Sequence, residues 1–198
     1  GSEMCIRDRY YSSKIAAIIE NVDKSDGIVF IYSKYIHAGV IPMALALESN
    51  GYTKYNSPLL KQDNQKNQKK HKGNYIIISG DNDLSKNAYI EYIKLQNNNK
   101  NGELVKIIIG SETAAEGLDF SYIRQVHILD PWFHLNKIQQ VIGRAIRNCS
   151  HIELESNLRN VMVFLYASTK SKKPSDDPET IDLNIYRNCL LYTSDAAD

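Results

Sequence analysis

Short apolar runs of strand length alternate with longer segments of helical pattern along this chain. Continuous apolar runs bounded by turn residues are typical of strands buried on both faces of a sheet. Such runs occupy residues 28–32, 75–78, 105–109, 126–129 and 161–166, and helical segments lie at residues 12–20, 36–49, 84–96 and 134–146. This alternation predicts an α/β fold, an open parallel sheet with helices on both faces.

Two stretches depart from this pattern. Residues 53–74 are polar and repetitive, and six lysines against one aspartate leave a local charge of +5. Such a composition buries too little apolar surface to order itself, so we expect a flexible basic insertion on the surface. Residues 169–188 are also polar, and we expect a tail or the start of a further extension.

The ends of the chain look foreign to the protein. Residues 4–9 and 189–198 resemble translated sequencing-adapter read-through. We therefore exclude residues 1–9 and 189–198 from the fold and expect a native lobe over residues 10–168, truncated on both sides.

Composition narrows the function classes only slightly. A chain of 198 residues with 42% hydrophobic and 24% charged residues suits one globular domain. The net charge of +1 means that a nucleic-acid binder would need a local basic patch. No apolar run approaches the ~20 residues of a membrane span, and the three cysteines are scattered. We expect an intracellular protein with no membrane partner.

The segment from Gln139 to Arg147 carries the most specific pattern. On a helix, Arg144 and Arg147 share a face, and Gly143 beside them permits close approach. Two guanidinium groups placed in this way suit arginine fingers, which stabilise the charge that builds up on a transferring phosphoryl group. Taken alone, the same pattern also fits an amphipathic helix with two solvated arginines.

A second segment combines a strand with small and hydroxyl residues. The strand ending at Gly110 is followed by Ser111, Thr113, Gly117 and Asp119. Small residues let a backbone approach a ligand, hydroxyl groups contact phosphate, and an aspartate can accept a hydrogen bond from a ribose hydroxyl. An ordinary loop between a strand and a helix would look similar.

Together these segments resemble motifs V and VI of superfamily 2 helicases, whose second RecA-like lobe carries both in this order. Motif VI commonly reads Gln-x-x-Gly-Arg-x-x-Arg, and this chain fills each fixed place with Gln140, Gly143, Arg144 and Arg147. Motif V commonly ends Arg-Gly-Leu-Asp, whereas this chain reads Glu116-Gly117-Leu118-Asp119. Glu116 puts in doubt any charge contact that the family's arginine makes.

The resemblance implies a role for each matching residue. Arg144 and Arg147 would be catalytic arginine fingers that reach ATP held by another lobe. Contacts to the nucleotide would come from Gly117, Asp119, Gln140 and Gly143. The nucleic-acid backbone would be contacted by Ser33 of a motif IV-like strand, Gly80, Ser111 and, as a weaker candidate, Thr113. Contacts of this kind position a backbone without reading its sequence.

The residues that follow motif VI narrow the resemblance. Asn148-Cys149-Ser150-His151, Leu154 and the strand from Val161 to Tyr166 resemble helicases of nucleo-cytoplasmic large DNA viruses. Those akin to the poxvirus early transcription factor helicase subunit are the nearest, which implies viral transcription machinery as a partner and a host-cytoplasmic or virion location.

Two helicase motifs are absent from this chain. It contains no Gly-x-x-x-x-Gly-Lys-Ser/Thr loop for phosphates and no acidic Mg²⁺ box. We therefore expect ATP and Mg²⁺ to be bound mainly by an N-terminal RecA-like lobe of the same protein, and the fragment alone to be inactive.

Two alternatives remain open. Asp130-Pro131-Trp132 before the motif VI helix also resembles Snf2-type translocases of double-stranded DNA, although these usually continue Ile-Gly-Gln after the last arginine. A helicase-derived lobe could also serve as a non-catalytic assembly module, although such a module would not need intact arginine fingers.

Three further features favour structural roles. Cys149 and His151 lie close in sequence, but a metal site needs about four ligands, so we expect none. His127 lies in an apolar strand and reads as a satisfied core or surface histidine. Trp132 and Phe133 fit packing at the sheet edge better than base stacking.

Overall fold

The computed structural model describes residues 12–56, 59, 70–112, 119–133, 135–147, 150–169 and 179–194. Within these ranges lie six strands in one sheet: β1 (Ile28–Tyr32), β2 (Tyr52–Lys54), β3 (Gly73–Ile78), β4 (Ile107–Gly110), β5 (Ile123–Ile128) and β6 (Met162–Leu165). Their order across the sheet is β2-β3-β4-β1-β5-β6, and every neighbouring pair is parallel. The predicted α/β fold is therefore confirmed.

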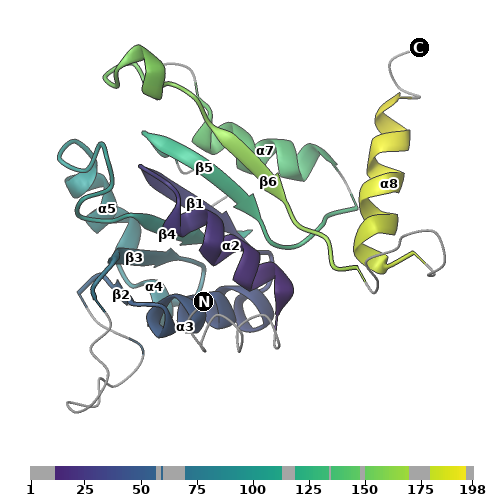
Figure 1. Cartoon of the computed structure of the whole chain (residues 1–198), viewed down its shortest axis with the longest axis horizontal. Coiled ribbons are helices and arrows are strands. Elements are labelled where there is room, and N and C mark those ends of the chain that lie inside the picture. Colours follow the sequence, from purple (N-terminus) through teal and green to yellow (C-terminus); the bar gives the residue numbers. More distant parts are fainter. Residues whose placement is uncertain are drawn as a thin grey trace.

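Helices cover both faces of this sheet (Figure 1). The helices α2 (Ser13–Asp23) and α3 (Ile41–Ser49), the latter preceded by the π-helical turn η1 (Ile36–Val40), pack on one face. The opposite face is covered by α5 (Ala88–Gln96) and α7 (Leu135–Ala145). The short elements α4 (Asn82–Ser85) and η2 (Ser156–Leu158) complete the lobe.

The central strands have the burial that their apolar runs predict. All residues of β1 and β4 are buried, and alternate side chains enter the two cores. Val29 and Ile31 face α2 and α3, whereas Phe30 packs against Phe120 on the other side with ring centroids 5.0 Å apart. Because β1, β3, β4 and β5 run parallel, their carboxyl ends lie along one edge of the sheet, where open α/β folds bind ligands.

Strand β2 shows that part of the predicted insertion is ordered. Residues 53–54 and 73–74 lie in β2 and β3, which pair from Tyr52 with Gly73 to Lys54 with Tyr75. A three-residue strand that contains Thr and Lys has no apolar run by which it could be predicted. Its pairing with β3 holds it in the sheet instead. Residues 57, 58 and 60–69 of the predicted insertion lie outside the described residues.

Helix α8 (Ile181–Ser194) differs from our expectation of a polar tail over residues 169–188 and of no fold beyond it. It lies beyond the carboxyl ends of β5 and β6 (Figure 1). Asp182 holds its first turn by an ion pair with Lys14 of 2.7 Å and by accepting a hydrogen bond from Ser168 N. The Asp182 carboxylate thereby stabilises this helix. Composition alone does not reveal its contacts with Lys14 and Ser168. The adapter origin of residues 1–9 and 189–198 stays a prediction.

Candidate nucleotide and nucleic-acid interface

Helix α7 presents one buried and one open face. Its buried residues, Ile138, Val141 and Ala145, are at most 2% exposed and follow the three- and four-residue spacing of an amphipathic helix. Gln139, Gln140 and Gly143 lie on the exposed side. Gln140 and Gly143 of the predicted motif VI therefore lie on the face of α7 that the described part of this chain leaves open. Arg147 lies beyond the end of α7 at Ala145, so the prediction that it shares a helix face with Arg144 is wrong.

Gly143 stands out on this open face. A Cβ atom added to Gly143 would meet nothing within 4 Å, helix backbone apart. Packing within the described chain therefore does not require a glycine here, although glycine in a helix interior costs roughly 0.5–1 kcal/mol relative to alanine. A close approach by another molecule or lobe would explain it.

Arg144, Arg147 and Asp119 form an ion cluster beside this face. Arg147 donates a hydrogen bond to Asp119 Oδ2, and Arg144 Nη1 lies 3.7 Å from Asp119 Oδ1. The backbone joins the same segments, because Phe120 N donates to Arg144 O at 3.3 Å. The structure thus brings the ends of the two predicted motifs together.

The cluster remains accessible. The side chains of Arg144, Arg147 and Asp119 are 34%, 60% and 47% exposed. Asp119 lies between the two guanidinium groups, and both groups remain partly open to solvent. Phosphate oxygens could replace the carboxylate as partners of both arginines, because bidentate pairing with oxyanions suits guanidinium groups. These residues therefore fit the phosphate end of a nucleotide.

The described residues that we predicted to contact a nucleic-acid backbone lie at the carboxyl edge of the sheet. Ser33 N donates to Gly110 O at 3.1 Å, and Ser111 N donates to Ile78 O at 3.0 Å, so the turns after β1, β3 and β4 adjoin. Gly80 is exposed, whereas Ser111 is 3% exposed. Thr113 and Gly117 lie outside the described residues.

Ser33 is engaged within the protein. It is 1% exposed, its Oγ donates to Asp130 Oδ2 at 2.5 Å, and the same oxygen accepts from Tyr35 N at 3.2 Å. Gly39 makes room for this pair, since an added Cβ would overlap Ser33 Oγ and lie 2.7 Å from Ser33 Cβ. The sequence did not reveal this pairing, because Asp130 and Ser33 end strands far apart in the chain.

His127 is a satisfied core histidine, as its apolar strand indicated. It is 0% exposed, its Nε2 lies 3.0 Å from Gln125 Oε1 and its Nδ1 lies 2.8 Å from Tyr166 Oη. Burial lowers the pKa of His127 from 6.5 to about 4. The imidazole is therefore neutral at pH 7, with Nε2–H donating to Gln125 and Nδ1 accepting from Tyr166.

His151 also has a structural partner. Its Nε2 lies 2.6 Å from Ile123 O, and Ser150 Oγ lies 2.7 Å from its Nδ1, which ties the end of motif VI to the start of β5. Cys149 lies outside the described residues, and within the described ranges no three His, Cys, Asp or Glu side chains gather as metal ligands. None of the described helices combines the length and apolar character that a membrane span requires.

An open, all-parallel sheet whose motif V and motif VI segments meet at an arginine–aspartate cluster defines the second RecA-like lobe of a helicase. The chain belongs to the helicase conserved C-terminal domain family, which matches residues 13–149.

Relatives among curated proteins come largely from large DNA viruses. The chain is 33% identical over 162 residues to "Putative ATP-dependent RNA helicase R563" of Acanthamoeba polyphaga mimivirus, covering 80% of this chain and 26% of that protein. It is 30% identical over 211 residues to "Termination factor NPH-I homolog" of African swine fever virus, covering 90% and 30%. "Putative helicase 087L" of Invertebrate iridescent virus 3 is 31% identical, covering 93% and 19%. The predicted resemblance to such viral helicases is confirmed, and the chain spans less than a third of each relative.

Solved structures support the fold. The C-terminal part of the Fun30 ATPase domain superimposes with a TM-score of 0.60 at 17% identity, covering 90% of this chain and 45% of that one. The yeast DEAD-box splicing factor Prp28 gives a TM-score of 0.54 at 16% identity, covering 90% and 30%. At these identities the likeness establishes the RecA-like fold alone.

Proposed function

We propose that this chain is the C-terminal lobe of an ATP-dependent nucleic-acid helicase or translocase, and that Arg144 and Arg147 are its arginine fingers. The observation that carries the proposal is the exposed cluster of both arginines with Asp119, beside the open face of α7. The side chains of Arg144 and Arg147 are 34% and 60% exposed, so the phosphates of a nucleotide held by a second lobe can reach both.

The fingers act by charge placement. ATP, held with Mg²⁺ mainly by an N-terminal lobe of the same protein, would supply the phosphoryl group that is transferred to water. Arg144 and Arg147 leave Asp119 and stabilise the negative charge of the transition state, an effect worth about 10³–10⁵ in rate for arginine fingers. Asp119 is then available to a ribose hydroxyl.

The remaining motif residues shape the contact between lobes. Gln140 lies on the exposed side of α7 and would link the nucleotide to the lobe interface. The glycines Gly117 and Gly143 let the partner surface come close, because neither carries a side chain. Closure of the lobes would then complete the site, as lid closure does in other enzymes.

The carboxyl edge of the sheet would hold the nucleic-acid backbone. Gly80, Ser111 and Thr113 are the proposed contacts, with Ser33 joining them if its bond to Asp130 is exchanged for a phosphate. Such contacts carry no sequence information. A place in viral transcription is supported by the name of the relative from African swine fever virus, a termination factor homologue.

ATP turnover by the isolated chain and by the parent protein tests this proposal. The isolated chain should hydrolyse no ATP above background, whereas a parent protein with both lobes should show turnover stimulated by nucleic acid. Robust turnover by the isolated chain would contradict the division of the site between two lobes.

A further inference from the structure

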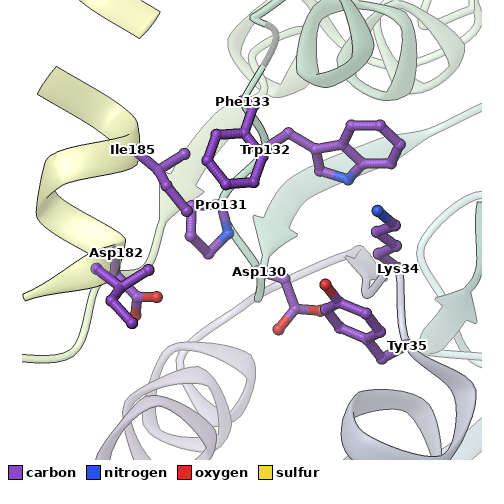
Figure 2. A pocket seen from close by; sticks show the side chains of 9 residues that line it. Lys34, Tyr35, Asp130, Pro131, Trp132, Phe133, Asp182 and Ile185 are labelled. Carbon is purple, nitrogen blue, oxygen red and sulfur yellow. The ribbon is translucent and has the colours of Figure 1, made fainter. Parts of the chain in front are cut away.

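Three aromatic and two lysine side chains gather where β1 and β5 end. We name Lys34, Tyr35, Trp132, Phe133 and Lys137 the aromatic–lysine cluster. Lys34 Nζ lies 4.4 Å from the Trp132 ring centroid and 5.6 Å from that of Tyr35, and Lys137 Nζ lies 5.7 Å from Trp132. Figure 2 shows Lys34 reaching up beside the indole, with Tyr35 below it.

Two of the three aromatic side chains are open to solvent, and Trp132 is partly buried. Phe133 is 73% exposed and Tyr35 is 52% exposed. The Trp132 indole N–H is buried and has no hydrogen-bond acceptor within the described part of the chain. Leaving a buried donor unsatisfied is costly, so an incoming acceptor group would relieve it. Trp132 packs partly buried against the core, as predicted, but packing does not account for the exposed Tyr35 and Phe133 rings or for the unpaired indole N–H.

The cluster also carries two lysine charges. Neither Lys34 nor Lys137 takes part in any ion pair between described residues. Of the two carboxylates at the pocket, Asp182 pairs with Lys14, whereas Asp130 accepts a hydrogen bond from Ser33 and keeps its negative charge. The cluster therefore offers two cations next to exposed rings.

The pocket within the cluster limits what can enter. Its volume is about 190 Å³, and Lys137 is not part of its wall. Besides the other four cluster residues, it is lined by Asp130, Pro131, Ile181, Asp182 and Ile185 (Figure 2). Pockets for whole drug-sized ligands usually have roughly 300–1,000 Å³. This pocket suits a single flat ring, with a charged chain running past it over the lysines.

We propose that the aromatic–lysine cluster binds a single-stranded nucleic acid through its bases, with one unstacked base against Tyr35, Trp132 and Phe133 and the flanking phosphates on Lys34 and Lys137. Sequence-tolerant strand binding elsewhere combines such stacking with a cationic track. The proposal rests on the proposed function, and it adds a base-binding site to the backbone contacts at the same sheet edge. It also favours a strand with free bases over a fully paired duplex.

Trp132 makes the test specific, because it is the one tryptophan of the chain. The full chain is titrated with a fluorescent thymidine oligonucleotide of about 12 nucleotides, within the usual site sizes. Anisotropy of the oligonucleotide reports binding, and tryptophan emission, measured with an unlabelled copy, reports a base at the cluster. A matched oligonucleotide without bases keeps the charge and removes the rings.

The proposal predicts quenching of Trp132 that saturates at the same Kd as the anisotropy, and little quenching by the abasic strand. Tyr35→Ala and Phe133→Ala should each weaken binding by about 5- to 150-fold, as loss of a stacked base does. Lys34→Ala and Lys137→Ala should each lower the salt slope by about 0.7. The controls Ile90→Ala and Lys94→Ala, both on α5, should change neither the affinity for the oligonucleotide nor the salt slope.

Other outcomes overturn the proposal in distinguishable ways. Binding without quenching, with equal affinity for the abasic strand, leaves the proposed backbone contacts standing and removes the base site. An absence of binding at low salt removes both. A change in Trp132 emission on adding the parent's N-terminal lobe, with none on adding the oligonucleotide, assigns the cluster to lobe docking instead.

Discussion

Replacing Gly143 with alanine separates stability from function at the centre of motif VI. Nothing lies within 4 Å of the position that the new Cβ would take, apart from the helix's own backbone. The substitution should therefore act on the isolated chain only through helix propensity. Gly143 precedes the last two residues of α7, so we expect a gain of roughly 0.5–1 kcal/mol in the free energy of unfolding.

This gain is measurable. For a chain of this size, 1 kcal/mol corresponds to a change of roughly 2–4 °C in Tm. Gly143→Ala should thus raise the Tm of the isolated chain by about 1–4 °C in thermal denaturation followed by circular dichroism. Gln139→Ala is the matched control, because it also raises helix propensity on the exposed side of α7 but removes atoms instead of adding them.

The same substitution should harm the parent protein. If a second lobe and its nucleotide press against Gly143 on closure, the extra methyl group keeps the fingers from seating, and a misplacement of about 1 Å can cost roughly 10²-fold in rate. We expect nucleic-acid-stimulated ATP turnover to fall by about that factor in Gly143→Ala and to stay within about twofold in Gln139→Ala. Unchanged turnover in Gly143→Ala would refute the inference that this glycine exists for close approach.

Three further substitutions test the structure. Gly39→Ala should destabilise the chain by roughly 1–3 kcal/mol in urea denaturation, because the new Cβ would overlap Ser33 Oγ, and Ser33→Gly should restore part of the loss. Between pH 6.5 and about 4, His127 is protonated in the unfolded chain but neutral in the folded chain. Lowering the pH through this window should therefore reduce the free energy of unfolding by about 3 kcal/mol. The His127→Gln variant should lack this fall in the free energy of unfolding. If the variant shows the same fall, His127 is not its cause. Asp119→Asn should change the stability of the isolated chain by less than about 1 kcal/mol, because its ion pairs are exposed, and a larger loss would show that the cluster is structural.

The sequence predicted most of the sheet but not its order. Apolar runs marked β1, β3, β4 and β5, because strands buried on both faces need continuous apolar residues. The run over residues 161–166 also marked a strand, β6, but its predicted burial on both faces is wrong, because β6 lies at the sheet edge with Met162 and Leu165 about half exposed. Strand β2 escaped prediction since its pairing with β3, not its composition, holds it in the sheet. The place of β1 between β4 and β5 depends on contacts between distant residues, which periodicity does not encode.

For a similar reason, the sequence predicted single residues of the candidate site but not the contacts among them. Motif spacing pointed to Arg144, Arg147 and Asp119 separately, and the structure adds that they meet in one cluster. The bond between Ser33 and Asp130 and the clearance at Gly39 have no local signature. The aromatic–lysine cluster is likewise assembled from two segments, 34–35 and 132–137, that only the parallel pairing of β1 and β5 brings together.

ATP turnover by the parent protein carrying Arg144→Ala tests the central claim most directly. Nucleic-acid-stimulated kcat should fall by about 10³-fold or more while nucleotide binding is retained, because the finger acts on the transition state. Arg187→Ala removes an exposed arginine of α8 that pairs with Glu179, which precedes the helix, and should leave kcat unchanged. A kcat within about twofold of the wild type for Arg144→Ala would contradict the account, since losing even one oxyanion contact typically costs about 10²-fold.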